Sequence, residues 1–115
     1  MTDFLIPGEE AFDGFLEGVL SGDAELAVLF TAPAWCVPCR RFEPHWKKAH
    51  EQPVEGIVFA TVDMGDSPED TGQHWATARF GIRGVPQVKL FTAFGNIDIK
   101  SRAVVPLLKE ITSHG

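Results

Sequence analysis

The sequence at residues 35–39 is Trp35-Cys36-Val37-Pro38-Cys39, which contains the only two cysteines of the 115-residue chain. The apolar run 26–30 precedes this stretch, and residues 40–48 follow it. A short apolar run bounded by turn-forming residues is typical of a buried strand, and we interpret the segment after the cysteines as a helix. We therefore expect both cysteines at a junction where a strand ends and a helix begins.

This position predicts a reactive thiol at Cys36. Backbone N–H groups in the first turn of a helix lack intrahelical partners and carry partial positive charge. They stabilise a thiolate and lower its pKa below the roughly 8.5 of a free cysteine. Cys39 follows at i+3 on the same helix face and can resolve a mixed disulfide formed at Cys36. Pro38 suits the first helical turn, and Arg40 and Arg41 add positive charge nearby.

The two cysteines also permit two other interpretations. A Cys-x-x-Cys pair is also half of a zinc site, and His45 and His50 have a spacing that the second half could use. However, only five residues separate Cys39 from His45, against about twelve in a zinc finger. Ligands carried along one helix also cannot surround a metal tetrahedrally. A structural disulfide is the other alternative, and we favour redox chemistry without a metal over both.

Length and charge narrow the class of protein. A chain of 115 residues predicts a single domain spanning residues 1–115, and 44% apolar residues suffice for an ordinary core. The net charge of −6 argues against nucleic acid or anionic membrane surfaces as partners. No apolar run approaches the ~20 residues of a membrane span. The first residues lack the pattern of a signal peptide, so we expect a cytoplasmic protein, and we expect it to be a monomer.

Hydrophobic periodicity predicts an α/β fold. Strands are expected at residues 4–6, 26–31, 57–62, 87–91 and 97–100, and helices at 9–20, 36–49, 69–79 and 106–112. The helix at 69–79 would bury Trp75, Ala78 and the adjoining Phe80. Strands separated by helices favour parallel pairing, whereas the turn at 93–96 favours an antiparallel hairpin. The expected architecture is a central mixed sheet of four to five strands flanked by four helices.

Several of these motifs resemble those of the thioredoxin family. The Trp-Cys-x-Pro-Cys stretch at 35–39 is similar to the active site of that family, and Pro44 follows five residues after the second cysteine. The segment 80–86 resembles the loop that ends in the family's cis-proline, and Asp63 matches its strand-end aspartate. The resemblance covers almost the whole chain and implies the thioredoxin fold.

The resemblance implies a role for each matching residue. Cys36 would be the exposed attacking thiolate and Cys39 the buried resolving thiol. Pro86 would be cis and lie against the disulfide, which leaves the backbone of Val85 free to pair with an extended substrate segment. Trp35 would form an apolar rim beside the cysteines.

Residues between and around the cysteines complete the expected contact surface. Val37 and Pro38 separate the two cysteines. Val37 stands where the family often has glycine, and its β-branched side chain is expected to stiffen the loop. Ser101 stands where a glycine usually lines the substrate groove. Phe30 and Phe59 occupy the positions that we assign to the family's buried aspartate and its lysine partner. Since both charges are absent together, our hypothesis is that Cys39 lacks an internal proton acceptor.

The resemblance implies a thiol–disulfide oxidoreductase that reduces protein disulfides through the Cys36/Cys39 dithiol. Its redox-active disulfide would need no organic cofactor or metal, and a thioredoxin reductase or an equivalent reductant would restore the dithiol. One alternative is a disulfide oxidase or isomerase in an oxidising compartment. The other is a thioredoxin-fold binding subunit or chaperone whose thiols are not required.

Overall fold

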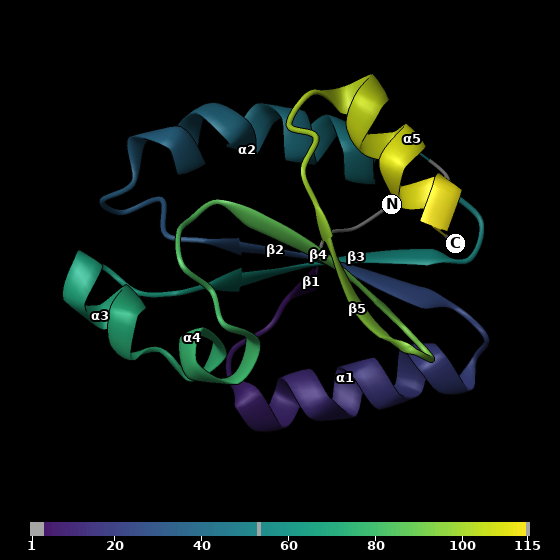
Figure 1. Cartoon of the computed structure of the whole chain (residues 1–115), viewed down its shortest axis with the longest axis horizontal. Helices are drawn as coiled ribbons and strands as arrows, with labels where there is room; N and C mark the ends of the chain where they lie inside the picture. The colour runs from purple at the N-terminus through teal and green to yellow at the C-terminus, as the bar shows by residue number, and fades with distance from the viewer. Residues whose placement is uncertain (1–3, 53, 115) are drawn as a thin grey trace.

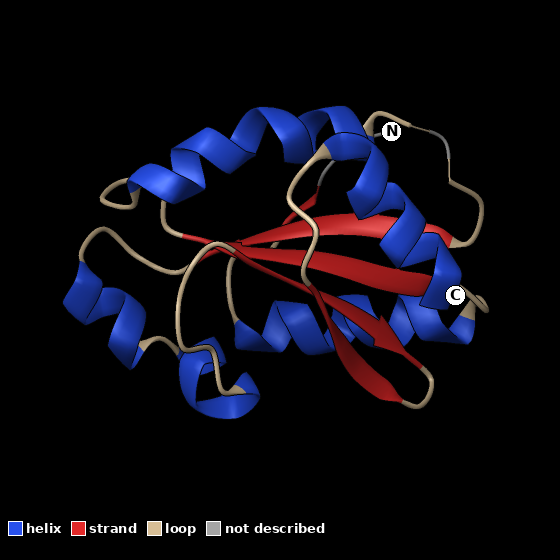
Figure 2. Cartoon of the chain, turned by 45° about the horizontal axis from the view of Figure 1, so that its top comes forward, coloured by secondary structure: helices blue, strands red, loops and turns tan. Residues whose placement is uncertain are grey.

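The computed structural model describes residues 4–52 and 54–114, and these residues form one five-stranded sheet with helices on both faces (Figures 1 and 2). The strands are β1 (Phe4–Leu5), β2 (Glu25–Thr31), β3 (Ile57–Asp63), β4 (Gln87–Thr92) and β5 (Gly95–Ile99). The helices are α1 (Glu9–Ser21), α2 (Val37–His50), α3 (Pro68–Gln73), α4 (Trp75–Phe80) and α5 (Val104–His114). The predicted α/β class with a mixed sheet is confirmed.

The strand order is β1-β3-β2-β4-β5, with β2 at the centre. β2 pairs in parallel with β3 and antiparallel with β4, so that Leu29 lies between Thr61 and Val88. Six of the seven β2 residues are buried, as expected for a strand covered on both faces. The chain therefore leaves a strand that is packed on both faces just before the Cys-x-x-Cys stretch begins.

Helices cover the two faces of the sheet in separate groups. α2 and α5 lie on one face, and α1, α3 and α4 lie on the other (Figure 1). Because side chains alternate along a strand, β2 contributes Leu29 to a core beneath α2 and Val28 and Phe30 to a core above α1. We call these the α2-face core and the α1-face core. Among the described residues, no helix combines the length and the apolar character that a membrane span requires.

The direction of β4 differs from the expectation. Parallel pairing was predicted for strands separated by helices, and β1, β2 and β3 follow it, but β4 runs antiparallel to β2. α3 and α4 have six residues each, which gives each a length of about 9 Å, against about 23 Å for a seven-residue strand. Neither helix can carry the chain back along the sheet. β4 therefore starts at the end where β2 and β3 finish (Figure 1).

The predicted helix at 69–79 is two helices, so the described chain has five helices instead of four. His74 separates α3 from α4 with an extended backbone, φ −64° and ψ 146°. Its imidazole Nδ1 accepts the backbone N–H of Ala76 at 3.2 Å and caps α4, while Ser67 caps α3. The break also changes which face is buried. Ala76 is buried, and Ala78, which we expected in the core, is exposed.

Candidate active site

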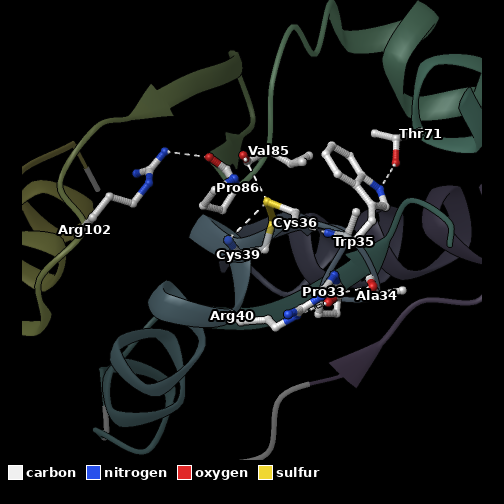
Figure 3. Close-up of a disulfide and its surroundings, with 11 residues drawn as sticks. Pro33, Ala34, Trp35, Cys36, Cys39, Arg40, Thr71, Val85, Pro86 and Arg102 are labelled. Atoms are coloured by element: carbon white, nitrogen blue, oxygen red, sulfur yellow. Dashed lines mark hydrogen bonds between the residues drawn. A yellow bond between two sulfur atoms is a disulfide. The ribbon is translucent and has the colours of Figure 1, made fainter. Parts of the chain in front are cut away.

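The two cysteines lie where predicted, at the start of α2, and they form a disulfide (Figure 3). Cys36 is the N-cap residue, with φ −96° and ψ 109°, and Cys39 lies in the first turn. Pro38 also occupies this first turn, where its missing N–H removes no helical hydrogen bond. The short loop after β2 thus delivers Cys36 to a helix start, and helical spacing brings Cys39 to it.

Backbone groups surround the two sulfur atoms. Cys36 Sγ accepts the backbone N–H of Cys39 at 3.1 Å, and Cys39 Sγ accepts the N–H of Ala32 at 3.5 Å. Cys36 Sγ also lies 3.5 Å from the carbonyl oxygen of Val85. The N–H contact to Cys36 is the interaction expected of an unpaired donor in the first helical turn. It would stabilise a thiolate on this sulfur after reduction.

Cys36 is less accessible than expected. We predicted an exposed sulfur, but only 3% of Cys36 is accessible, against 1% of Cys39. In the closed disulfide both cysteines pack with Ala32, and Trp35 and Val85 lie against them. The exposed surface at this point of the chain belongs instead to Val37 and Pro38, and Val37 is 47% accessible. The residues that cover Cys36 come from two loops, one before α2 and one before β4. The spacing within the Cys-x-x-Cys motif therefore could not predict this burial.

The α4–β4 loop forms the opposite wall of the site. The peptide bond between Val85 and Pro86 is cis, and both residues are half-buried beside the disulfide (Figure 3). The Pro86 carbonyl accepts a hydrogen bond from Arg102 at 3.3 Å. The structure thus brings Val85 and Pro86 to the sulfurs, as the resemblance implied.

Trp35 is held by a residue that sequence reasoning missed. Its indole Nε1–H donates to the hydroxyl of Thr71 on α3 at 3.0 Å. The carbonyl of Thr71 in turn accepts the hydroxyl of Thr77 on α4 at 2.6 Å. The split between α3 and α4 therefore positions the aromatic wall of the site. A threonine in a short helix carries no local signal of this contact.

Arginines near the site have different roles. Arg40, expected to add charge beside the thiolate, donates from its guanidinium to the carbonyls of Pro33 at 2.7 Å and Ala34 at 3.1 Å. It therefore braces the loop before Cys36. Arg41 on the next position of α2 is exposed and lines a groove beside Pro38.

Arg102 is a second residue that the sequence did not single out. Its guanidinium donates to the carbonyls of Ile99 at 2.7 Å, Ser101 at 3.0 Å and Pro86 at 3.3 Å, and lies 5.3 Å from the ring centre of Phe42. Arg102 and Lys100, the two neighbours of Ser101, line a groove beside Pro86, and a role of Ser101 in substrate binding stays a prediction. A lone arginine after a strand gives no local indication that it reaches the cis-proline.

Phe30 and Phe59 do not form a spatial pair. We placed them at the positions of a buried aspartate and its lysine partner, but Phe30 lies in the α1-face core and Phe59 in the α2-face core. Leu29 is the β2 residue that shares a core with Phe59. The pairing was wrong because adjacent strand residues point to opposite faces. The absence of an internal proton acceptor for Cys39 remains a prediction.

The zinc interpretation finds no support in the site. Among residues 4–52 and 54–114, no group of three or more His, Cys, Asp or Glu side chains is placed to hold a metal ion. Cys36 and Cys39 are bonded to each other, so the redox centre at this helix start is the disulfide itself.

Comparisons with known proteins agree with this geometry. The family model described as Thioredoxin matches residues 8–109. Protein disulfide-isomerase erp38 of Neurospora crassa is 38% identical over 81 residues, which is 69% of this chain and 21% of the isomerase. The thioredoxin of Pyropia yezoensis is 29% identical over 90 residues, covering 78% of both chains. This chain thus spans about a fifth of the disulfide-isomerases that it matches.

A solved structure agrees on the fold. The X-ray structure of Fasciola hepatica thioredoxin superposes with a TM-score of 0.75 at 18% identity, covering 97% of this chain and 99% of that one. The matched region holds the disulfide at the start of α2 and the cis-proline facing it. With its fold, its Cys-x-x-Cys site and its family match in agreement, the chain belongs to the thioredoxin family.

Proposed function

We propose that this protein is a thiol–disulfide oxidoreductase that reduces disulfide bonds of proteins. The observation that carries the proposal is the Cys36–Cys39 disulfide at the start of α2, with the Cys39 N–H donating to Cys36 Sγ. A sulfur that accepts this helix-start donor is activated as a nucleophile when reduced. A second sulfur three residues on can close the disulfide without rearrangement of the chain.

The reaction proceeds in two exchanges. The thiolate of reduced Cys36 attacks one sulfur of the substrate disulfide, the substrate S–S bond breaks, and the other substrate sulfur leaves as a thiolate. Cys39 loses its proton to this thiolate or to water and attacks Cys36 Sγ. The mixed disulfide breaks and releases the second substrate thiol. Two electrons pass to the substrate, and the Cys36–Cys39 disulfide forms.

Five residues are proposed to contact the substrate around the sulfurs. Val37 and Pro38 provide exposed surface on α2, and Trp35 provides an aromatic wall fixed by its hydrogen bond to α3. Val85 and Pro86 lie beside Cys36, and the backbone of Val85 is proposed to pair with an extended substrate segment.

The proposed direction is reduction. In the described part of the chain, the groups within hydrogen-bonding distance of the sulfurs all belong to the backbone. Pro38 between the cysteines carries no charge. A thiolate whose hydrogen bonds come from the backbone alone gives a more reducing couple than one that also accepts a hydrogen bond from a cationic side chain. We therefore expect a reduction potential nearer the about −270 mV of thioredoxin than the about −180 mV of protein disulfide-isomerase.

An isomerase or oxidase is the second candidate, because the relatives at 35–38% identity are named protein disulfide-isomerases. Equilibration of the protein with glutathione, read by thiol alkylation, separates the two. A potential near that of isomerases would move the proposal to this candidate.

Reduction of insulin in the presence of dithiothreitol tests the activity. The protein is expected to accelerate insulin precipitation, and Cys36→Ser is expected to return the rate to that of dithiothreitol alone. Cys39→Ser should instead accumulate a mixed disulfide at Cys36, detectable by mass spectrometry. If wild-type protein binds insulin without accelerating its reduction, the binding-subunit or chaperone alternative replaces the enzyme.

Cellular context is also a proposal. We propose a cytoplasmic monomer whose dithiol is restored by a thioredoxin reductase or an equivalent reductant. The large apolar side chains exposed in the described region are scattered over the β1 edge, the site and the β4–β5 turn: Phe4, Leu5, Val37 and Phe94. Light scattering tests the monomer, and alkylation of the cysteines in fractionated cells tests both location and redox state.

A further inference from the structure

A groove of about 380 Å³ adjoins the disulfide on the α2 side. Its lining, which we call the cationic groove, consists of Pro38, Arg41, Phe42, His45, Pro86 and Arg102. Pro38 lies between the cysteines, and Pro86 follows the Val85 carbonyl that contacts Cys36. A substrate segment whose cysteine is bonded to Cys36 therefore passes the mouth of this groove.

The groove has an apolar floor with fixed walls. Phe42 is 4% accessible and packs in the α2-face core. The imidazole of His45 lies nearly parallel to the Phe42 ring, at 16° and 6.5 Å between centres. On the other side, the guanidinium of Arg102 lies 5.3 Å from the same ring centre and is tied by its bond to Pro86. The hydrogen bond directs the guanidinium of Arg102 at the Pro86 carbonyl (Figure 3).

Two arginines are among the described residues that line the groove. Burial lowers the pKa of Arg102, and the nearby carboxylates of Glu110 and Asp98 oppose this; the guanidinium stays charged at neutral pH. Asp98 is engaged by Lys89 at 2.6 Å, and no carboxylate is among the described residues that line the groove. Arg41 forms none of the ion pairs found in the described region. This positive site stands out on a chain of net charge −6.

We propose that the cationic groove binds an acidic side chain of the protein substrate, and that it selects disulfides whose reactive cysteine is flanked by Asp or Glu. The proposal rests on the proposed function and adds a substrate class to it. A carboxylate next to the attacked cysteine would meet Arg41 and Arg102, while its methylene groups would lie on Phe42. Arginine forks suit carboxylates because they can donate two parallel hydrogen bonds.

Two peptides test the proposal. Each contains one disulfide, and they differ only in having two Glu or two Lys residues beside the reactive cysteine. Second-order rate constants for their reduction by the reduced protein are measured at low salt and at about 0.15 M salt, where charges are screened beyond ~8 Å. Exposed ion pairs change an equilibrium by up to about fivefold each. We therefore expect Arg41→Glu to lower the ratio of the two rate constants, Glu peptide over Lys peptide, roughly tenfold at low salt. The decrease should be smaller at the higher salt.

Lys47→Glu is the matched control. Lys47 is exposed on α2 outside the groove, and its substitution changes the net charge by the same amount. The ratio for this variant should stay within about twofold of wild type. His45→Glu, a second exposed lining residue, should act in the same direction as Arg41→Glu. Equal ratios for Arg41→Glu, His45→Glu and Lys47→Glu would overturn the proposal, because they would show a net-charge effect alone.

An uncharged disulfide separates this proposal from the proposed function. The rate with bis(2-hydroxyethyl) disulfide measures the reactivity of Cys36 in each variant, and it should be the same for wild type and Lys47→Glu. If wild type reduces neither this disulfide nor insulin, the oxidoreductase function itself is wrong. If wild type, Arg41→Glu and Lys47→Glu all reduce this disulfide but the peptide ratio is insensitive to Arg41, the function stands and the acidic-substrate assignment is wrong.

Discussion

On the α1 face of the sheet, aromatic rings pack around Phe12. On the α2 face, a row of contacting side chains extends from the core to Pro86 beside the disulfide. The ring centres of Trp75, Phe80 and Phe91 lie 5.3–5.5 Å from that of Phe12. None of these four residues is a proposed site residue. The α1-face core therefore mainly stabilises the sheet, and of the proposed site residues in the described chain only Val85 packs against it.

The α2-face core forms a continuous path to the site. Phe59 packs edge-on against Trp46 at 5.4 Å, Trp46 lies 6.2 Å from Phe42, and Phe42 lies beneath Arg102. Arg102 then donates to Pro86 beside the sulfurs. Phe42 is also three residues beyond Cys39 on α2. The comparison teaches that substitutions on the two faces should have different consequences: on the α1 face for stability alone, and on the α2 face for stability and substrate preference.

The largest expected effect on stability comes from Phe12→Ala. Phe12 is fully buried, and removal of a core phenylalanine costs about 3–5 kcal/mol. Urea denaturation should show this loss, while the rate of disulfide reduction per folded molecule stays within about twofold of wild type. Phe94→Ala, at a fully exposed position, is the control and should change stability by less than about 0.5 kcal/mol. A rate loss that matches the stability loss would break the separation between the faces.

A smaller effect on stability, with a change in specificity, is expected for Phe42→Leu. The lost ring atoms should cost about 1–2 kcal/mol. The guanidinium of Arg102 also loses its aromatic support, so the preference for acidic peptides should fall by about half or more. Val88→Ala provides a comparison at a buried α2-face position outside the groove. If both variants change peptide preference equally, the path through Phe42 has no special role.

The smallest effect expected is a pH dependence at His74 on the α1 side. Burial lowers the pKa of His74, opposed by the charge of Asp63, and its Nδ1 must be unprotonated to accept the Ala76 N–H. The unfolded chain, with a pKa of about 6.5, then binds more protons than the folded one. The stabilisation is complete above about pH 6.5 and is lost as the pH falls through the folded pKa. A helix cap of this kind contributes about 1 kcal/mol.

His74→Asn checks this prediction, because asparagine caps helices without titrating. Urea midpoints at about pH 7.5 and about pH 5 should differ less for the variant than for wild type. An unchanged difference would show that other groups cause the pH dependence. Reduction of an uncharged disulfide at neutral pH should be unaffected, since His74 contacts no sulfur.

Features of the fold that depend on neighbours in sequence were predictable. Leu26 to Thr31 are apolar or small on both alternating sides, which is enough to place β2 inside a layered sheet. The prediction of one helix over 69–79 was wrong because the hydrophobic periodicity of this segment gives no indication of the extended backbone at His74. The predicted direction of β4 was wrong for a related reason, because the direction depends on the short length of the two helices α3 and α4.

By itself, the sequence determined that two sulfurs lie one helical turn apart at the start of α2, because strand, loop and helix spacing act within about ten residues. Only the tertiary structure decided what surrounds them. Val85 meets Cys36 across 49 positions of the chain, and Arg102 meets Pro86 across 16. These contacts follow from the order and direction of strands, which loop closure and core packing set together. The same packing buries Cys36 and brings Arg41 and Arg102 together at the adjoining groove.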